Sequence, residues 1–207
     1  MTLPFLERKI YGVSSLTHIL RIIRVKKKNT KIHEINAKQN YYNLKTIFII
    51  RHAKSSWAEL GARDFDRVLD KRGINDAPRM AKILKEAGVH PDLIVSSPAM
   101  RAKTTAHYFA KEFGMSPEQI DYQSDIYDAV ETDIFNIVRE LPNTASVVLL
   151  FGHNPTLTYF TNNFNPDPIE NLPTCGIVRI ALNVDEWSKF SDKTARVTGL
   201  WFPKMYK

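Results

Sequence analysis

Two arginines and two histidines in this chain stand just after apolar segments. Arg51 and His52 follow the first segment directly, Arg101 comes shortly after the second, and His153 comes after the third. In open α/β proteins, ligands bind beyond the carboxyl ends of the strands. We therefore expect these four side chains to converge on one site. The apolar segments that precede them are residues 47–50, 93–95 and 147–151.

Two arginines at one site indicate an anionic ligand, because each guanidinium offers a rigid fork of donors that matches phosphate or carboxylate. Ser97 and Pro98 are typical of a helix start, with serine as the cap and proline at the first helical position. The free amides and positive dipole of such a terminus would favour an anion further. Arg101 would then lie in the first turn and face the same pocket.

His52 is the candidate nucleophile, because a neutral imidazole can attack phosphorus and hold the phosphoryl group until water removes it. Flanking arginines would disfavour its imidazolium form, and a backbone carbonyl accepting from the other ring nitrogen would fix the tautomer. We expect His153 to be cationic and to stabilise charge on the transferring group. The other histidines are expected to occupy ordinary core or surface positions: His18, His33, His90 and His107.

The elements that must position these residues follow an α/β pattern. The three apolar runs lack polar alternation, as expected of strands buried on both faces. Between them, apolar residues recur at three- and four-residue spacing, which predicts helices that end near Gly88 and Gly114. Pro78 lies within the first of these, so we expect that helix to kink there or to begin close to it.

Later segments complete the expected architecture. Apolar spacing predicts a helix over 134–141 and a short one over 157–160, and two further strands are expected over 177–182 and 195–201. We expect an α/β fold, a three-layer α/β/α sandwich with a mostly parallel central sheet.

The basic charge of the chain is concentrated at its start. The net charge is +7, yet residues 1–45 carry ten Lys or Arg against two Glu, so residues 46–207 sum to −1. We interpret residues 1–43 as a basic N-terminal extension, either disordered or a misassigned start, and residues 44–207 as the folded domain. A nucleic-acid or membrane-surface arm is the alternative for this extension.

Arginines interrupt the apolar patch at residues 16–23, so it fits neither a secretory signal nor a membrane span. The single cysteine, Cys175, excludes an internal disulfide and suits a reducing compartment. We therefore expect a cytoplasmic protein with no membrane partner and no nucleic-acid partner.

The three motifs resemble those of the histidine phosphatase (phosphoglycerate-mutase-like) superfamily. Residues 51–57 are similar to its Arg-His signature, and residues 97–101 and 152–155 are similar to its second and third motifs, in order. Ala53, the short spacings, residues 64–69 and the terminal Pro203 and Lys204 resemble its SixA-like phosphohistidine phosphatase branch. The likeness runs from about Leu44 to Lys207.

This resemblance implies a three-layer fold and a covalent phosphohistidine mechanism on His52, with no metal and no other cofactor. It strengthens the expectation that Arg51, His52, Arg101 and His153 are catalytic. The residues expected to bind substrate are Arg51, Arg101, His153, Ser97 and Ser55.

A proton donor for the leaving group is harder to identify. Larger members of the superfamily carry an acid after the second arginine, whereas here Asp128 and Glu131 lie between Arg101 and His153 without matching a motif. A phosphohistidine substrate needs less help, because imidazole can leave from a ring that is already protonated. We therefore expect phosphohistidine on a protein as the substrate, with a sugar phosphate or another small phosphorylated metabolite as the alternative.

Other classes of protein fit less well. A metal-dependent hydrolase would have to use His52, His153, Asp64 and Asp66, which lack the usual ligand spacing. Cys175 and Arg179 are too close together for a cysteine-phosphatase loop, and no Gly-rich nucleotide loop is present. A non-catalytic phosphate-binding module would bind phosphate without turnover.

Overall fold

The computed structural model describes residues 45–57 and 63–206, which belong to one compact unit, Asn43–Lys207. The expectations for residues 1–43, and for His18 and His33, lie outside the described residues.

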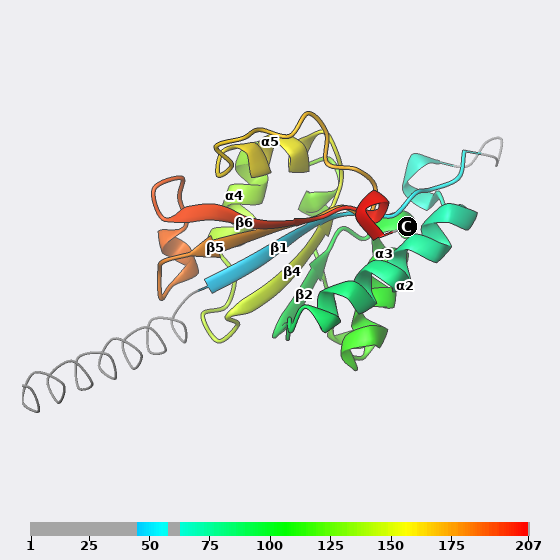
Figure 1. Cartoon of the computed structure of the whole chain (residues 1–207), viewed down its shortest axis with the longest axis horizontal. Coiled ribbons are helices and arrows are strands. Elements are labelled where there is room, and N and C mark those ends of the chain that lie inside the picture. Colours follow the sequence, from blue (N-terminus) through cyan, green and yellow to red (C-terminus); the bar gives the residue numbers. More distant parts are fainter. Residues whose placement is uncertain (1–44, 58–62, 207) are drawn as a thin grey trace, which may run out of the picture. The chain divides into compact units, whose positions relative to one another are not determined.

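The described strands form a single mixed sheet (Figure 1). β1, β2, β3 and β4 pair in parallel, whereas β5 runs antiparallel to β1 and β6 antiparallel to β5. The predicted strands are therefore confirmed, and only the two-residue β3 was not predicted, because two residues carry no periodicity. In sheet order, the strands are β3 (Asp121–Tyr122), β2 (Leu93–Ser96), β4 (Val147–Gly152), β1 (Lys45–Arg51), β5 (Ile177–Leu182) and β6 (Ala195–Trp201).

Helices cover both faces of this sheet, which confirms the three-layer arrangement (Figure 1). α2 (Lys71–Glu86) and α3 (Met100–Phe113) pack on one face, and α4 (Glu131–Arg139) and α5 (Thr156–Asn162) pack on the other. No helix among the described residues is long and apolar enough to span a membrane. The short 3₁₀ helices are η1 (Asp64–Asp66), η2 (Pro117–Gln119), η3 (Ser124–Ile126), η4 (Trp187–Lys189) and η5 (Pro203–Tyr206).

β1 shows why its sequence is apolar without interruption. Ile47 and Ile49 belong to the core beneath α4 and α5, whereas Phe48 and Ile50 belong to the core beneath α2 and α3. Successive side chains of a strand point to opposite faces, so a strand covered on both sides needs an apolar residue at every position. This burial anchors the strand that ends in Arg51 and His52.

Two helix starts bear on the sequence-based expectations: for the helix that contains Pro78, a start close to Pro78 is wrong and the kink stays a prediction. α2 begins at Lys71, seven residues before Pro78, and Asp70 caps it by accepting the Gly73 N–H at 2.8 Å. The cap and the buried apolar face of α2 outweigh the hydrogen bond that proline cannot donate. α3 begins at Met100 with Ala99 as its N-cap, so the predicted cap at Ser97 is wrong.

Candidate active site

The register of the sheet brings the ends of three strands to one level. Arg51 on β1 pairs with Gly152 on β4, and Ser96 on β2 pairs with Phe151 on β4. The ladder continues one step further, because the His52 N–H donates to the Gly152 carbonyl at 3.1 Å. His52, Ser97 and His153 therefore leave the same edge of the sheet side by side.

The segment before β5 supports the backbone of this first motif. The Cys175 N–H donates to the carbonyls of Arg51 (3.0 Å) and His52 (3.1 Å), and the Arg51 N–H donates to Gly176 at 3.1 Å. Cys175 has a φ of 58°, in the left-handed region that most residues avoid. In this strained turn, the Cys175 N–H is shared by the carbonyls of Arg51 and His52, and these bonds fix the position of His52.

The first motif also rests on α2. A Cβ on Gly73 would lie 2.1 Å from the Lys54 carbonyl oxygen, and the Asp70 N–H donates to the same oxygen at 3.0 Å. Only glycine permits this approach, so the first turn of α2 packs directly on the loop that follows His52.

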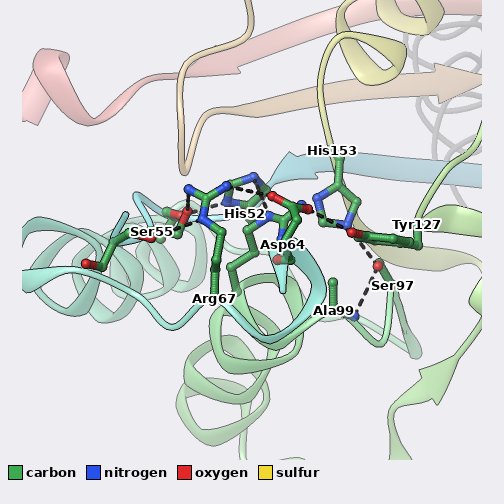
Figure 2. Close-up of polar contacts among 11 residues, drawn as sticks. His52, Ser55, Asp64, Arg67, Ser97, Ala99, Tyr127 and His153 are labelled. Atoms are coloured by element: carbon green, nitrogen blue, oxygen red, sulfur yellow. Dashed lines mark hydrogen bonds and ion pairs between the residues drawn. The ribbon is translucent and has the colours of Figure 1, made fainter. Parts of the chain in front are cut away.

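The converging side chains surround a cavity of about 360 Å³. Arg51, His52, Arg101 and His153 all line it, as predicted from their places after the strands. Figure 2 shows His52 and His153 facing the same space, with Asp64 and Tyr127 beside them. The remaining lining residues are Lys54, Ser55, Trp57, Asp64, Arg67, Tyr127, Asp128, Asn154 and Thr174.

His52 is held in one orientation with one ring nitrogen toward the cavity. Its Nδ1 lies 2.7 Å from the Ala53 carbonyl oxygen, and its Nε2 lies 3.3 Å from Nε of Arg101. Because Arg101 can only donate, Nε2 is the acceptor and Nδ1 carries the proton. Thr105 of α3 secures this loop by accepting the Ala53 N–H at 3.0 Å.

Burial, with the charges of Arg101, Arg51 and Arg67, lowers the pKa of His52 to about 3, although the hydrogen bond to the Ala53 carbonyl acts to raise it. The ring is therefore neutral near pH 7. The sequence analysis assigned this effect to the flanking arginines, but desolvation is the larger cause.

Arg101 lies in the first turn of α3, as expected, and its side chain is almost fully buried. Arg51 reaches across the cavity to the segment before β5, where its Nη1 donates to the Leu172 carbonyl at 2.7 Å. Asn154 donates to the same carbonyl at 3.1 Å. Both arginines line the cavity, and their guanidiniums are held by different segments, Arg51 by the one before β5 and Arg101 by Asp64.

His153 is neutral in this structure. Burial, with the charges of His52, Arg101 and Arg51, lowers its pKa to about 2, although Asp64 acts to raise it. The cation was expected against phosphate, and that expectation stays a prediction. The ring centroid of His153 lies 5.1 Å from that of His52, and its Nδ1 is a buried atom with no hydrogen-bond partner.

Of the two serines expected to bind substrate, one faces the cavity. Ser55 lines it and accepts from Nη2 of Arg67 at 2.6 Å. Ser97 is not among the lining residues; its hydroxyl lies 2.8 Å from Nε2 of His153. The effect of Ser97 on a ligand would therefore pass through the orientation of His153.

From the sequence, Tyr127 was not predicted to belong to this site, and Asp64 was named only as a ligand in the metal-dependent alternative. The Asp64 carboxylate accepts from Arg101, Arg67 and the Tyr127 hydroxyl, each at 2.8 Å. Burial would raise the pKa of Asp64, but hydrogen bonds from Arg67, Tyr127 and Arg101 hold it far below its usual range. The segment 64–69 was noted for its resemblance, yet nothing in it indicated contact with Arg101.

Of the two acids considered as proton donors, only one lies at the cavity. Asp128 lines the cavity, whereas Glu131 does not and accepts a hydrogen bond from Asn163. Asp66, named in the metal alternative, pairs with Arg63 at 2.7 Å rather than facing the cavity. Within the described ranges, no three His, Cys, Asp or Glu side chains are grouped so that they could hold a metal ion.

The lowered pKa values of His52 and His153 predict a dependence of stability on pH. Between about pH 6.5 and about pH 3, the unfolded chain binds protons at both positions and the native chain does not, so the free energy of unfolding should fall as the pH falls. Urea unfolding at about pH 7 and about pH 4.5 would measure this loss. The free energy of unfolding of a double variant, His52→Gln with His153→Gln, should decrease less over this pH range than that of the wild type. An equal decrease would contradict these pKa values.

Comparisons with known proteins agree with this fold and site. A model of the histidine phosphatase superfamily (branch 1) matches residues 47–126, which include the first two motifs. An uncharacterized chloroplastic protein of Arabidopsis thaliana is 33% identical over 116 residues, 52% of this chain and 53% of that protein. The match thus spans about half the length of this relative.

Solved structures extend the likeness over the whole described domain. A crystal structure provisionally named phosphohistidine phosphatase SixA, from Agrobacterium tumefaciens, is 26% identical with a TM-score of 0.65, covering 77% of this chain and 98% of that one. The protein histidine phosphatase SixA complexed with tungstate shares the fold at 20% identity, with a TM-score of 0.66 and coverage of 78% and 99%.

The fold, the motifs and these matches show what the chain is similar to: the histidine phosphatase superfamily over residues 47–126 and, in its fold, SixA phosphohistidine phosphatases.

Proposed function

We propose that this protein is a metal-independent phosphatase that forms a phosphohistidine intermediate on His52 and removes phosphate from phosphohistidine on a protein. One observation carries the proposal. His52 is buried and neutral, its Nδ1 proton is donated to the Ala53 carbonyl, and its unprotonated nitrogen, Nε2, accepts from Arg101 in a cavity lined by two arginines. A fixed and neutral nucleophile beside guanidinium groups is what phosphoryl transfer to a histidine requires.

The transfer can be written from these atoms. The lone pair of His52 Nε2 attacks phosphorus, the bond from phosphorus to the substrate nitrogen breaks, and its electron pair stays on the departing imidazole. The ring of His52 then carries the phosphoryl group on Nε2 and a proton on Nδ1, with positive charge shared between them. The Ala53 carbonyl, 2.7 Å from Nδ1, stabilises that charge.

Hydrolysis reverses these changes. Water attacks phosphorus, the P–Nε2 bond breaks, and its electron pair returns to Nε2, which leaves a neutral ring with its proton still on Nδ1. The water proton passes to phosphate or solvent. His52 can therefore leave without a proton donor, because the ring it becomes is already neutral.

Arg51, Arg101 and His153 are proposed to bind the phosphoryl oxygens. Both arginines line the cavity, and the buried Nδ1 of His153 has no protein partner, so it can contact a phosphoryl oxygen. A phosphate dianion would raise the pKa of His153, since a nearby negative charge favours the imidazolium. The cationic form expected from the sequence would then belong to the ligand-bound site.

The choice of substrate rests on the acids of the site. Asp64 is ionised and held by three donors, so it is poorly suited to protonate a leaving group. An imidazole leaving group needs no such proton when its second nitrogen is already protonated. This supports phosphohistidine on a protein over an alkyl phosphate, whose alkoxide is a poor leaving group.

A small phosphorylated metabolite, such as a sugar phosphate, is the second candidate. A cavity of about 360 Å³ falls within the size range of small-molecule sites, and Asp128 on its wall offers a carboxyl group. Under this alternative, Asp128→Asn would lower turnover of a sugar phosphate.

The intermediate can be tested directly. The enzyme would be mixed with a histidine-phosphorylated protein, quenched, and analysed for phosphate that is labile in acid and stable in base. We expect such phosphate on the peptide that contains His52, and none in His52→Ala. Label on another residue, or turnover without label at rapid quench times, would contradict the mechanism.

The same preparation distinguishes the two substrates. We expect kcat/KM on the histidine-phosphorylated protein to exceed that on an aryl phosphate and on sugar phosphates. If only the small phosphates turn over, the protein substrate is wrong and the mechanism stands.

A further inference from the structure

Asp64 contacts Arg101 through both its backbone and its side chain. Nη1 of Arg101 donates to the Asp64 carbonyl oxygen at 2.6 Å, and Nη2 donates to Oδ2 at 2.8 Å. The third donor position of this guanidinium, Nε–H, points to Nε2 of His52 at 3.3 Å. Two sides of the planar group are therefore held by one residue, and the remaining side faces the proposed nucleophile.

The Asp64 carboxylate is itself held from two further directions. Arg67 donates to Oδ1 and Tyr127 donates to Oδ2, each at 2.8 Å. Arg67 is anchored in turn by bonds to the Ser56 carbonyl and to Ser55. Figure 2 shows this chain of hydrogen bonds running from Ser55 through Arg67 and Asp64 to Tyr127, whose ring packs edge-on against His153. Asp64 is therefore held in place by several hydrogen bonds, and it in turn restricts the position of Arg101.

This arrangement has a chemical consequence for His52. The lone pair of Nε2 accepts a hydrogen bond from Arg101 in the phosphate-free structure, yet the same lone pair must attack phosphorus in the proposed reaction. The Nε–H of Arg101 must therefore release Nε2 of His52 and donate to a phosphoryl oxygen instead. Because the two Nη groups stay on Asp64, this exchange requires only a small tilt of the guanidinium.

We propose, on the basis of the proposed function, that Asp64 is a positioning residue that holds the Arg101 guanidinium with its Nε–H directed at the reacting atoms. In the free enzyme that N–H covers the nucleophile, and in the substrate complex it moves to the phosphoryl oxygen beside it. Asp64 also offsets part of the positive charge of the cavity, so phosphate and product are held less tightly than two free arginines would hold them.

The test separates positioning from simple structural support. Asp64→Asn removes the negative charge that orients Arg101, so kcat should fall by about 10- to 100-fold. The same change frees the guanidinium and raises the positive potential of the anion site. Inhibition by tungstate, a tetrahedral oxyanion, should therefore become stronger, with an inhibition constant lower by roughly 3-fold or more.

A matched control lies in the same 3₁₀ helix. Asp66 pairs with the exposed Arg63 and does not line the cavity, so Asp66→Asn should leave both kcat and tungstate inhibition unchanged. Tyr127→Phe supplies a second, milder variant, because it keeps the ring beside His153 and removes only the bond to Asp64. We expect Tyr127→Phe to change kcat and inhibition in the same directions as Asp64→Asn, by smaller factors.

The outcomes distinguish this inference from the proposed function. If Asp64→Asn lowers kcat and weakens tungstate binding together, its role is structural support and the inference is wrong. If it behaves like Asp66→Asn while His52→Ala is inactive, the inference again fails and the proposed function stands. If His52→Ala retains full turnover, the proposed function itself fails.

Discussion

Replacing His52 with alanine should lower kcat/KM for phosphate release by about 10⁴-fold or more, because it removes the atom that accepts the phosphoryl group. Among the described histidines, only His153 also lines the cavity; its Nε2 is bonded to Ser97 and its Nδ1 is proposed to contact a phosphoryl oxygen, so we do not expect it to replace His52. The loss should appear in kcat and equally on a protein and on an aryl phosphate substrate. Steady-state phosphate release and rapid-quench labelling would measure it.

His107→Ala is the matched control for that experiment. His107 is half-buried like many functional histidines, yet its Nε2 bonds to the Tyr122 hydroxyl and it lies outside the cavity lining. We expect it to keep wild-type activity. Full activity in His52→Ala, with thermal unfolding unchanged in both variants, would show that His52 does not carry the phosphoryl group.

Replacing Arg101 with alanine should lower kcat by about 10²- to 10³-fold, the usual cost of losing one preorganised donor to a developing charge. The Arg101 side chain is 7% exposed and makes directional contacts to Asp64 and His52, so its charge acts on the cavity with little screening by water. Arg101→Lys should recover only a small part of this loss, because an ammonium cannot hold Asp64 and face His52 at once.

Arg139→Ala is a suitable comparison for the arginine variants. Arg139 also donates to a backbone carbonyl, that of Phe190, but it stands at the end of α4 and is not part of the cavity. The Arg139→Ala variant should turn over substrate at the wild-type rate. If Arg101→Lys were as active as the wild type, positive charge alone would suffice and the fixed geometry of the guanidinium would be unimportant.

Most of the fold could be predicted because it depends on local patterns. The uninterrupted apolar run of β1 reflects burial on both faces, and the same is true of β4. The start of α2 could not be predicted from Pro78, since the energy of the Asp70 cap and of the buried helix face decided it. Likewise, β3 exists through its pairing with β2 rather than through any pattern of its own.

Some residues of the candidate site could be predicted from local patterns, and others could not. Arg51, His52, Arg101 and His153 follow strands of one sheet, so their convergence could be expected from the rule that parallel strands end at one edge. Asp64 lies 37 residues before Arg101 and belongs to no strand, so only the packing of η1 against α3 brings the two together. The neutral state of His153 without phosphate could not be predicted either, because burial is a property of the folded chain and not of a motif.

The sequence by itself determined which residues stand at the end of each strand, and therefore which chemical groups the site contains. The tertiary structure decided what those groups can do. Burial makes both histidines neutral, the Ala53 carbonyl selects the nitrogen of His52 that faces the cavity, and Asp64 sets the direction of Arg101. Desolvation and hydrogen-bond direction depend on neighbours distant in the chain, whereas the place of each core strand in the sequence depends on its local run of apolar residues.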